Sequence, residues 1–511
     1  MAQKLKTNGK NEGKGNGRPS TKPAEKRKAA AADASLACVI LAAGQGTRMR
    51  SGRAKVLHEL LGRPMVAYPV ALAESLGADP IVAVLGHQRA AVEAALVARY
   101  GEDGVTVVEQ TERRGTGHAL MVALPALAKA RGMLVVLYGD VPMLEKATLS
   151  ALVGTARRYG CLALLTASPP DPTGYGRIVR DSRGHVLRIV EHKDATPEEL
   201  AIGEINAGIY AGPIELFREA LSRLDTRNAQ KEYYLTDVVA HAAATLGVST
   251  IEADFRSVAG VNDRKQLADA ESLLRSRVNA HWMRHATFHD PASTVVEPDV
   301  VIGVDAEIGR GVALRGKTRI GRGARIGDGV LLTDTDVGAG VEIKPYSVAT
   351  GASIGAGAKV GPFAHLRPGS VLGPDVHVGN FVETKKTKLG RGSKANHLTY
   401  LGDTTIGERV NVGAGTITCN YDGYVKRETI IEDGAFIGSD SQLVAPVRIG
   451  KRAVVAAGTT VTEDVPAGAL AISRVAQAAV PGYATKLAQR YAVASPPPAP
   501  AAPRKRRPAA I

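Results

Sequence analysis

The C-terminal half of the chain carries an aliphatic residue at every sixth position. The rungs of this ladder are Ile302, Ile308, Leu314, Ile320, Ile326, Leu332, Ile354, Val360, Leu366, Leu372, Val378, Ile431, Ile437, Leu443, Ile449, Val455 and Val461. A period of six fits neither an α-helix nor the alternation of hairpin strands. It is typical of a hexapeptide solenoid, in which each hexad forms one flat face of a three-sided parallel β-helix. We therefore predict stacked coils with the rungs pointing inward.

The residues between the rungs support the same interpretation. Many rungs are followed four positions later by a small or β-branched residue, such as Ala306, Val312 or Thr459. Glycine often follows the rung directly, as at Gly303 and Gly321. We expect these glycines to allow tight corners between faces.

The N-terminal half alternates apolar strands with helical patterns. Residues 37–41 form a continuous apolar strand of the kind found in parallel sheets. Further strands are predicted at 81–85, 105–108 and 134–137, and helices at 90–98 and 118–129. This order predicts a doubly wound α/β domain whose ligands bind at the carboxyl ends of the strands.

Two of these strand ends carry candidate chemistry. The first strand runs into Gly44-Gln45-Gly46, where small residues let backbone N–H groups approach a phosphate or a base. Arg48 follows as a phosphate clamp, with Lys55 just beyond. The spacing is neither a dinucleotide fingerprint nor a Walker loop, and a plain strand-to-helix turn stays open as an alternative. Asp140 ends a later strand and is either a ligand for a hard cation or a buried or capping residue.

The net charge of +15 is concentrated at the two ends of the chain. Residues 1–34 hold nine basic and three acidic residues, and residues 484–511 hold six basic and no acidic ones. Both tails are rich in Lys, Ala, Pro or Gly, so we predict disorder for residues 1–34 and 476–511. We expect no nucleic-acid partner, since any such binding would rest on the tails alone.

The remaining composition favours a cytoplasmic enzyme. Cys38, Cys161 and Cys419 are widely spaced and form no metal or redox pattern, so we expect reduced thiols. No apolar run approaches about 20 residues, and the N-terminus lacks an apolar signal core, so no membrane association is expected.

The ladder breaks between Val378 and Ile406 and again between Thr418 and Ile431, and such breaks commonly carry function. The first break holds His397 among basic, amide and phenolic groups, a setting suited to a phosphorylated amino sugar. The second break holds Asn420-Tyr421.

Taken together, these motifs resemble a known family. The α/β motifs are those of a sugar-phosphate nucleotidyltransferase: residues 41–49 with Lys55, Gly115-Thr116-Gly117-His118, Tyr138-Gly139-Asp140, residues 172–177, Glu191-His192-Lys193, residues 205–208 and Gly260-Val261-Asn262. With the hexapeptide coil, the set resembles the bifunctional enzymes of UDP-N-acetylglucosamine synthesis, which join a uridyltransferase to an acetyltransferase. The resemblance covers roughly residues 36–475.

The resemblance implies an α/β fold, with a Rossmann-like nucleotidyltransferase domain followed by a left-handed parallel β-helix. The implied boundaries are 35–262 for the first domain, 263–290 for a linking helix and 291–475 for the acetyltransferase domain. It also implies acetyl transfer from acetyl-CoA to glucosamine-1-phosphate, then Mg²⁺-dependent uridylyl transfer from UTP, feeding cell-wall and lipopolysaccharide precursors. The implied assembly is a homotrimer with acetyl-transfer sites between subunits.

The resemblance also assigns roles at the uridylyl-transfer site. Arg48 and Lys55 would hold the triphosphate, and Asp140 and Asn262 would bind Mg²⁺. The nucleotide and sugar would be held by Leu41, Ala42, Ala43, Gly44, Lys55, Gln110, Gly115, Thr116, Tyr138, Gly139, Asp140, Gly176, Glu191, Asn206 and Asn262.

At the acetyl-transfer site, the resemblance makes His397 the general base that accepts a proton from the attacking amine. Glucosamine-1-phosphate would be bound by Arg367, Glu383, Lys385, Tyr400 and Asn411. Acetyl-CoA would be bound by Ala414, Asn420, Tyr421, Ser439, Ala457 and Arg474, with Asn420 also reaching the sugar.

The sequence departs from the family pattern at three positions. Ala54 stands where the family usually has Pro, so we expect a looser loop around Lys55. Gln45 replaces a frequent Lys and should remove one charge near the phosphates. His365 replaces an Arg, which puts a secondary phosphate contact in doubt.

Two rival interpretations remain. The chain could be a single-activity nucleotidyltransferase with a structural or regulatory β-helix, although such enzymes lack the insertions at 397–400 and 420–421. It could also be a non-catalytic assembly subunit, which would have no need of Arg48, Lys55, Asp140 and Asn262.

Overall fold

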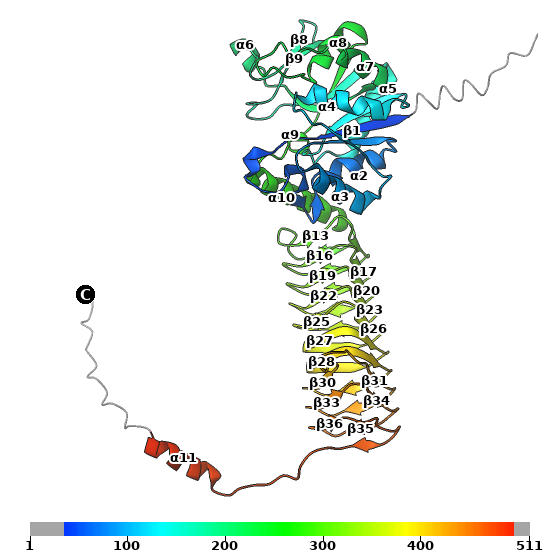
Figure 1. Cartoon of the computed structure of the whole chain (residues 1–511), viewed down its shortest axis with the longest axis vertical. Helices are drawn as coiled ribbons and strands as arrows, with labels where there is room; N and C mark the ends of the chain where they lie inside the picture. The colour runs from blue at the N-terminus through cyan, green and yellow to red at the C-terminus, as the bar shows by residue number, and fades with distance from the viewer. Residues whose placement is uncertain (1–34, 495–511) are drawn as a thin grey trace, which may run out of the picture. The chain divides into compact units, whose positions relative to one another are not determined.

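The computed structural model describes residues 35–494. The predicted disordered tail at 1–34 lies outside the described residues, as do residues 495–511 of the second tail. The chain forms two compact units, which divide between Gly340 and Val341. The first unit holds the α/β domain and the first β-helix coils, and the second holds the remaining coils (Figure 1).

A mixed sheet forms the centre of the α/β domain, with the strand order β11-β7-β10-β6-β1-β4-β5. Its strands are β1 (Leu36–Ala42), β4 (Ile81–Leu85), β5 (Thr106–Glu109), β6 (Met133–Tyr138), β7 (Leu162–Ala167), β10 (Ile205–Pro213) and β11 (Val248–Glu252). Strand β10 runs antiparallel to β6 and β7, and the other neighbours are parallel. Strand β8 (Arg177–Arg180) pairs antiparallel with β10, and β9 (Val186–Val190) pairs antiparallel with β8.

Helices cover both faces of this sheet because the side chains of β1 alternate between two apolar cores. Cys38 and Ile40 pack with α2 (Ala67–Ser75), α3 (Arg89–Tyr100) and α5 (Lys146–Tyr159). Val39 and Leu41 pack with α4 (Thr116–Ala123), α7 (Ile214–Leu221) and α8 (Asp237–Thr245). The shorter elements are η1 (Thr47–Met49), η2 (Lys55–Leu57), β2 (Glu59–Leu60), β3 (Arg63–Pro64), η3 (Leu124–Leu127), α6 (Pro197–Leu200) and α9 (Phe255–Val258). The predicted doubly wound domain is confirmed.

One predicted helix is shorter than expected. We predicted a helix over 118–129, but α4 ends at Ala123 and a 3₁₀ turn, η3, follows. Pro125 has no N–H to donate to the carbonyl four residues earlier, so regular α-helical bonding stops there.

Helix α10 (Arg264–Trp282) lies in the span predicted as a linking helix. The Asp263 side chain caps it by accepting a hydrogen bond from the Gln266 N–H at 2.8 Å. Near its end, Asn279 is buried and its Nδ2 donates to the carbonyls of Pro291 (2.8 Å) and Thr294 (2.9 Å), which fixes the start of the coils.

The coils form the predicted parallel β-helix. Strands β12–β26 span two or three residues each between residues 287 and 372. They are followed by β27 (His377–Leu389), β28 (Lys394–Ile406), β29 (Asn411–Val412), β30 (Ile417–Cys419), β31 (Thr429–Ile431), β32 (Phe436–Ile437), β33 (Gln442–Val444), β34 (Val447–Ile449), β35 (Val454–Val455), β36 (Thr460–Val461) and β37 (Leu470–Ala471). Most strands pair in parallel with the third strand after them, as β14 pairs with β17. Three successive strands, one on each face, therefore make one coil. Every predicted rung is at most 5% exposed, which confirms the inward ladder.

The structure corrects the expected role of most glycines that follow the rungs, whereas Gly361, with a φ of +92°, has the left-handed conformation that a corner requires. We expected them to bend the corners, but Gly303 and Gly321 do not have a positive φ. At Gly321, an added Cβ would lie 2.5 Å from the backbone of Gly338 in the next coil. These glycines therefore permit the close approach of stacked coils, whereas left-handed residues such as Asp305 and Asp403 lie at corners.

The predicted disorder of 476–511 is wrong for part of that segment. Helix α11 spans Tyr483–Ala494. Its Ala, Leu, Lys, Gln and Arg residues have high helix propensity, which the compositional argument for disorder overlooked.

Among residues 35–494, none of the helices has the length and hydropathy needed to cross a membrane.

The two adjacent valines of β35 test the inward ladder. Val455 is fully buried, whereas Val454 is 39% exposed. We expect Val455→Ala to destabilise the protein by about 2–3 kcal/mol, because it removes buried methyl groups and leaves a cavity. Val454→Ala should stay within about 0.5 kcal/mol of the wild type. Urea unfolding followed by circular dichroism measures both, and equal effects would contradict the inward orientation.

Candidate functional site

A cavity of about 280 Å³ lies at the carboxyl ends of β1 and β6, where Leu41 pairs with Tyr138. Ten predicted nucleotide-site residues line it: Leu41, Ala42, Ala43, Gly44, Lys55, Gln110, Gly115, Thr116, Tyr138 and Asp140. Gly139 is not among the lining residues; an added Cβ there would lie 2.9 Å from the Ala42 Cβ, so its role is to let two strand ends meet.

A second cavity of about 400 Å³ shares Tyr138 and Asp140 with the first. The other predicted residues that line it are Arg48, Gly176, Glu191, Asn206 and Asn262. The structure therefore brings all the predicted uridylyl-site residues other than Gly139 to two adjoining cavities.

Lys55 links the two cavities electrostatically. Its Nζ forms a short ion pair with Asp140 Oδ2 and donates to Asn262 Oδ1 at 3.1 Å. The Lys55 side chain is 11% exposed and that of Asp140 20%, so water screens the pair only partly. The two oxygen ligands predicted for Mg²⁺ thus converge on one cationic group.

Gly46 is needed for this arrangement. Its φ of +64° is left-handed, and an added Cβ would lie 2.4 Å from the Lys55 Cβ. A larger residue at this position would push Lys55 away from Asp140.

We expected Gln45 to remove a positive charge from beside the phosphates, but its side chain binds the guanidinium of Arg113. Arg113 Nη1 donates to Gln45 Oε1 at 2.8 Å, and Arg113 lines the first cavity. The guanidinium therefore supplies positive charge beside the glycine-rich loop.

Burial raises the pKa of two ionisable groups at these cavities. Desolvation, followed by the charges of Asp140 and Glu191, raises the pKa of the Tyr138 phenol, which stays neutral. Desolvation likewise raises the pKa of Glu191, although the Thr236 hydroxyl donates to its Oε1 at 3.0 Å and opposes the shift.

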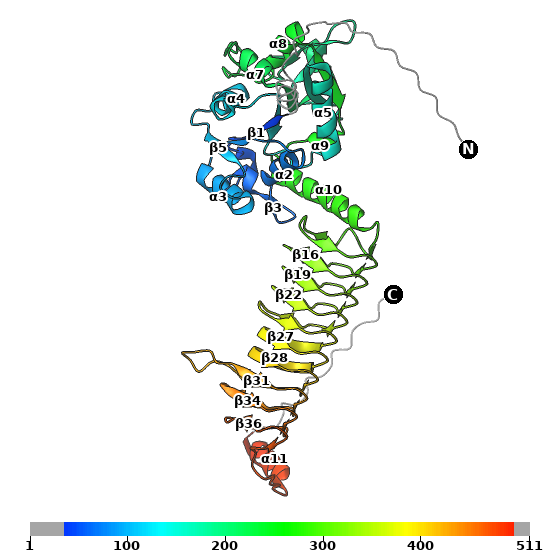
Figure 2. The ribbon, with the colours of Figure 1, turned by 90° about the vertical axis from the view of Figure 1, so that its right-hand side faces the viewer.

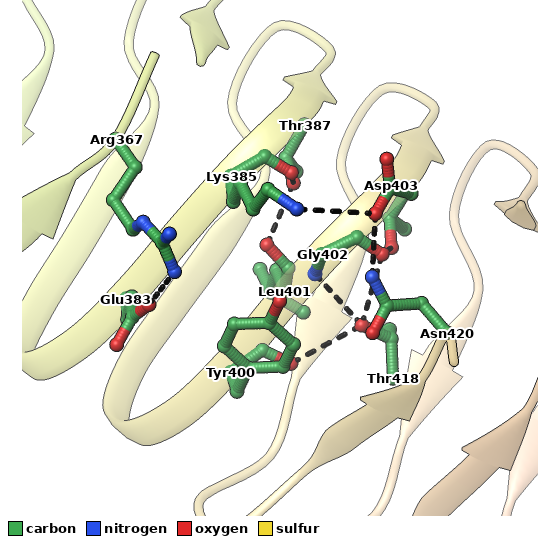
Figure 3. A network of polar contacts seen from close by, with 11 residues as sticks. Arg367, Glu383, Lys385, Thr387, Tyr400, Leu401, Gly402, Asp403, Thr418 and Asn420 are labelled. Atoms are coloured by element: carbon green, nitrogen blue, oxygen red, sulfur yellow. Dashed lines mark hydrogen bonds and ion pairs between the residues drawn. The ribbon is translucent and has the colours of Figure 1, made fainter. Parts of the chain in front are cut away.

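A second cluster lies on the β-helix, on the face formed by residues 382–385 of β27 and 399–402 of β28 (Figure 3). Arg367 Nη1 bonds Glu383 Oε1 at 2.8 Å, and Tyr400 is the register partner of Glu383. At one edge, Asp403 Oδ2 accepts from Asn420 Nδ2 at 2.5 Å and lies 3.9 Å from Lys385 Nζ. The ammonium of the nearby Lys426 lowers the pKa of Lys385.

His397 lies just beyond the edge of this face, across the corner formed by the left-handed Leu398 and in register with Asn380. It is exposed, and its Nδ1 is 3.3 Å from Asn380 Oδ1. The register of β28 with β29 places Ala414 one coil below His397, followed by Ser439 and Ala457 in the same column. Arg474 Nη1 donates to the Ala457 carbonyl at 2.7 Å.

One chain does not bring all the predicted acetyl-site residues together. Asn411 lies on the neighbouring face, in register with Lys394 and Phe436. Tyr421 lies in the loop between β30 and β31, which projects from the coils (Figure 2). His397 also lies on that neighbouring face, before the corner at Leu398, whereas Lys385 ends the first face before the corner at Lys386.

Sequence reasoning missed several polar partners at both sites. Asn380 and Asp403 contact predicted residues seventeen positions away, which is one coil, so the repeat length could have found them. Arg113 contacts Gln45 and Thr236 contacts Glu191 from loop positions, and no pattern in the sequence predicts either contact.

Comparison with known proteins identifies the family. A MobA-like NTP transferase domain profile matches residues 38–201, a GMPPB C-terminal domain profile matches 284–389, and a hexapeptide repeat of succinyl-transferase matches 428–463. The bifunctional protein GlmU of Sorangium cellulosum (strain So ce56) is 52% identical over 460 residues, covering 89% of this chain and 97% of that protein. The chain belongs to the bifunctional GlmU family.

Other GlmU proteins show the same coverage. That of Trichlorobacter lovleyi is 50% identical over 455 residues (88% of this chain, 98% of the relative), and that of Pelobacter propionicus 48% over 460 (89% and 99%). Membership of the GlmU family confirms the predicted resemblance, the fold class and a bifunctional transferase. The single-activity and non-catalytic alternatives are set aside, since the similarity spans both parts of the chain.

Glu191 gives a pH-dependent prediction. Its folded-state pKa lies above the ordinary 4.5, so deprotonation costs stability as the pH rises through 4.5 toward the folded value. We expect Glu191→Gln to raise the thermal midpoint at pH 7.5, because the amide stays neutral and can still accept from Thr236. The gain should shrink toward pH 4.5. Glu102→Gln, at an exposed carboxylate, is the control; a gain independent of pH would contradict the prediction.

Proposed function

We propose that this protein acetylates glucosamine-1-phosphate from acetyl-CoA and then joins N-acetylglucosamine-1-phosphate to UMP from UTP, releasing pyrophosphate. We assign uridylyl transfer to residues 35–262, acetyl transfer to residues 291–475, and the connection to residues 263–290. The observation that carries the first assignment is the Lys55–Asp140–Asn262 cluster between two adjoining cavities. Three free cysteines and cytosolic co-substrates support a cytoplasmic enzyme.

In uridylyl transfer, an oxygen of the sugar phosphate attacks the α-phosphorus of UTP, and the bond to the β-phosphate breaks. The protein has to bring two anions together and neutralise the leaving pyrophosphate. Lys55 and Arg48 flank the cavities with positive charge, and Arg113 adds a third cation. Glu191 and Asn206 line the cavity that we assign to the sugar.

Asp140 and Asn262 fit a magnesium ion. Their oxygens already converge on the Lys55 ammonium, and Mg²⁺ is commonly held by one or two protein oxygens with substrate phosphates completing its shell. When bound, Mg²⁺ neutralises phosphate charge. Lys55 would then be released to contact the triphosphate.

In acetyl transfer, the amine nitrogen attacks the thioester carbonyl carbon, the C–S bond breaks and coenzyme A leaves. The proposed base is the exposed His397, since Asn380 Oδ1 can accept from Nδ1–H and leave Nε2 free for the amine proton. Glu383 would attract the amine, Lys385 and Arg367 the phosphate, and Ser439 would donate to the thioester oxygen.

A homotrimer would complete this site. The aromatic column of Tyr346, Phe363 and Phe381 stacks with ring centroids 5.4 and 5.6 Å apart, and Leu398 continues it beside His397. These side chains are 49–67% exposed. A contiguous apolar stripe of this kind favours burial against other copies of the chain.

Reciprocal variants test the two-site proposal in a coupled assay with glucosamine-1-phosphate, acetyl-CoA, UTP and Mg²⁺. We expect His397→Ala to lower acetyl transfer at least about 100-fold and to spare uridylyl transfer, since it removes the general base. Asp140→Ala should do the reverse by removing a metal ligand and the partner of Lys55. If either variant, still folded, lost both activities, the assignment would be wrong.

The aromatic column tests the trimer. We expect Phe381→Glu to give smaller particles in sedimentation and to abolish acetyl transfer, while uridylyl transfer persists, because a charge at 56% exposure disfavours contact between copies but not folding. Tyr159→Glu, at another exposed aromatic residue, should change neither property. An unchanged trimer with Phe381→Glu would refute an interface at the column.

A further inference from the structure

The loop before Lys55 has little support of its own apart from a solvent-exposed ion pair between Arg53 Nη2 and Glu59 Oε1 at 2.9 Å, which water screens. Within residues 51–54, the Arg53 N–H bonds Ser51 Oγ at 3.0 Å, and Gly52 and Arg53 are exposed. Yet this loop sets the starting point of Lys55, whose ammonium must reach both Asp140 and Asn262.

Ala54 is the fixed point of the loop. It is 2% exposed, and it caps the 3₁₀ turn η2 with φ −54° and ψ 139°. Its N–H is held inside the protein and needs an acceptor. We expected Ala54 to loosen the loop, but the structure shows a partner for this group.

That partner is Gln88, which precedes α3 at the carboxyl end of β4. Gln88 Oε1 accepts from the Ala54 N–H at 2.8 Å, and Gln88 Nε2 donates to the Gly52 carbonyl at 2.6 Å. The two halves of one planar amide thus clamp the loop on either side of Arg53. Glutamine offers a donor and an acceptor on one group, which neither alanine nor glutamate can do.

We infer that Gln88 is a positioning residue for uridylyl transfer, which clamps residues 52–54 so that Lys55 enters the site in register with Asp140 and Asn262. The inference rests on the proposed uridylyl transfer. Gln88 is absent from the residues lining either cavity, so it acts through Lys55 and does not touch the nucleotide.

The φ of Ala54 indicates a substitution, Ala54→Pro, that should compensate for the loss of Gln88. Proline fixes φ near −65°, close to the observed −54°, and has no N–H. Ala54→Pro therefore stiffens the same position and removes the group that needs Gln88 as acceptor.

We expect Gln88→Ala to lower kcat/KM for uridylyl transfer about tenfold, since small displacements of a charged group are costly in catalysis. Acetyl transfer by the same preparation should be unchanged, which serves as the internal control. Hydrogen exchange of a peptide covering residues 51–57 should accelerate. In Ala54→Pro/Gln88→Ala, both uridylyl transfer and exchange should return to within about threefold of the Ala54→Pro single variant.

A second cycle with Lys55→Ala keeps the test independent of how well Ala54→Pro folds. Because Gln88 acts through Lys55, Gln88→Ala should change the residual activity of Lys55→Ala less than twofold. An unchanged kcat/KM in Gln88→Ala, or a full tenfold additive loss in the Lys55→Ala background, would overturn the inference. Lack of uridylyl transfer in the wild type would instead overturn the proposed function, and unaltered exchange at 51–57 would still refute the clamp.

Discussion

The burial of one aliphatic side chain every six residues is the constraint on which the β-helix depends. A hexad strand of two or three residues cannot bury its rung alone, so each coil needs the next. Stacking then brings residues one coil apart into register, as Asn380 with His397 and Glu383 with Tyr400. The chemistry of this part follows from that register: side chains far from one another in sequence form columns along the faces and corners.

The α/β domain also brings together residues that are far apart in the sequence, but it does so by strand pairing. The parallel pairing of β1 and β6 sets their carboxyl ends side by side, and the absence of a side chain at Gly139 lets the glycine-rich loop and Asp140 meet there. Charge then decides the local detail. A partly buried carboxylate needs a partner, and Lys55 supplies one. Because Lys55 has to reach Asp140 to form this ion pair, the loop that carries Lys55 must be held firmly.

Periodicity and strand ends were predictable because they depend on local patterns that repeat. All the rungs are buried as predicted, and the residues that the resemblance assigned to the nucleotide and the sugar, other than Gly139, line adjoining cavities. What the sequence could not show are single hydrogen bonds across the fold. Gln88 contacts Ala54 over 34 positions, and Arg113 contacts Gln45 over 68, with no periodic signal for either. The end of α4 at Ala123, shortly before Pro125, could have been found from the missing N–H of that proline alone. The role of the glycines after the rungs could not, because it depends on the backbone of the next coil.

The inward ladder also explains where the acetyl-transfer chemistry is placed. Because the rungs fill the interior of the coils, only outward-facing positions and corners remain for reactive groups. The corner at Leu398 carries His397, and the same corner in earlier coils carries the aromatic column. An exposed apolar column is unfavourable in water unless another surface covers it. If copies of the chain meet at this column, as proposed above, the covering surface would also reach His397, so burial of the column and completion of the site would be a single event.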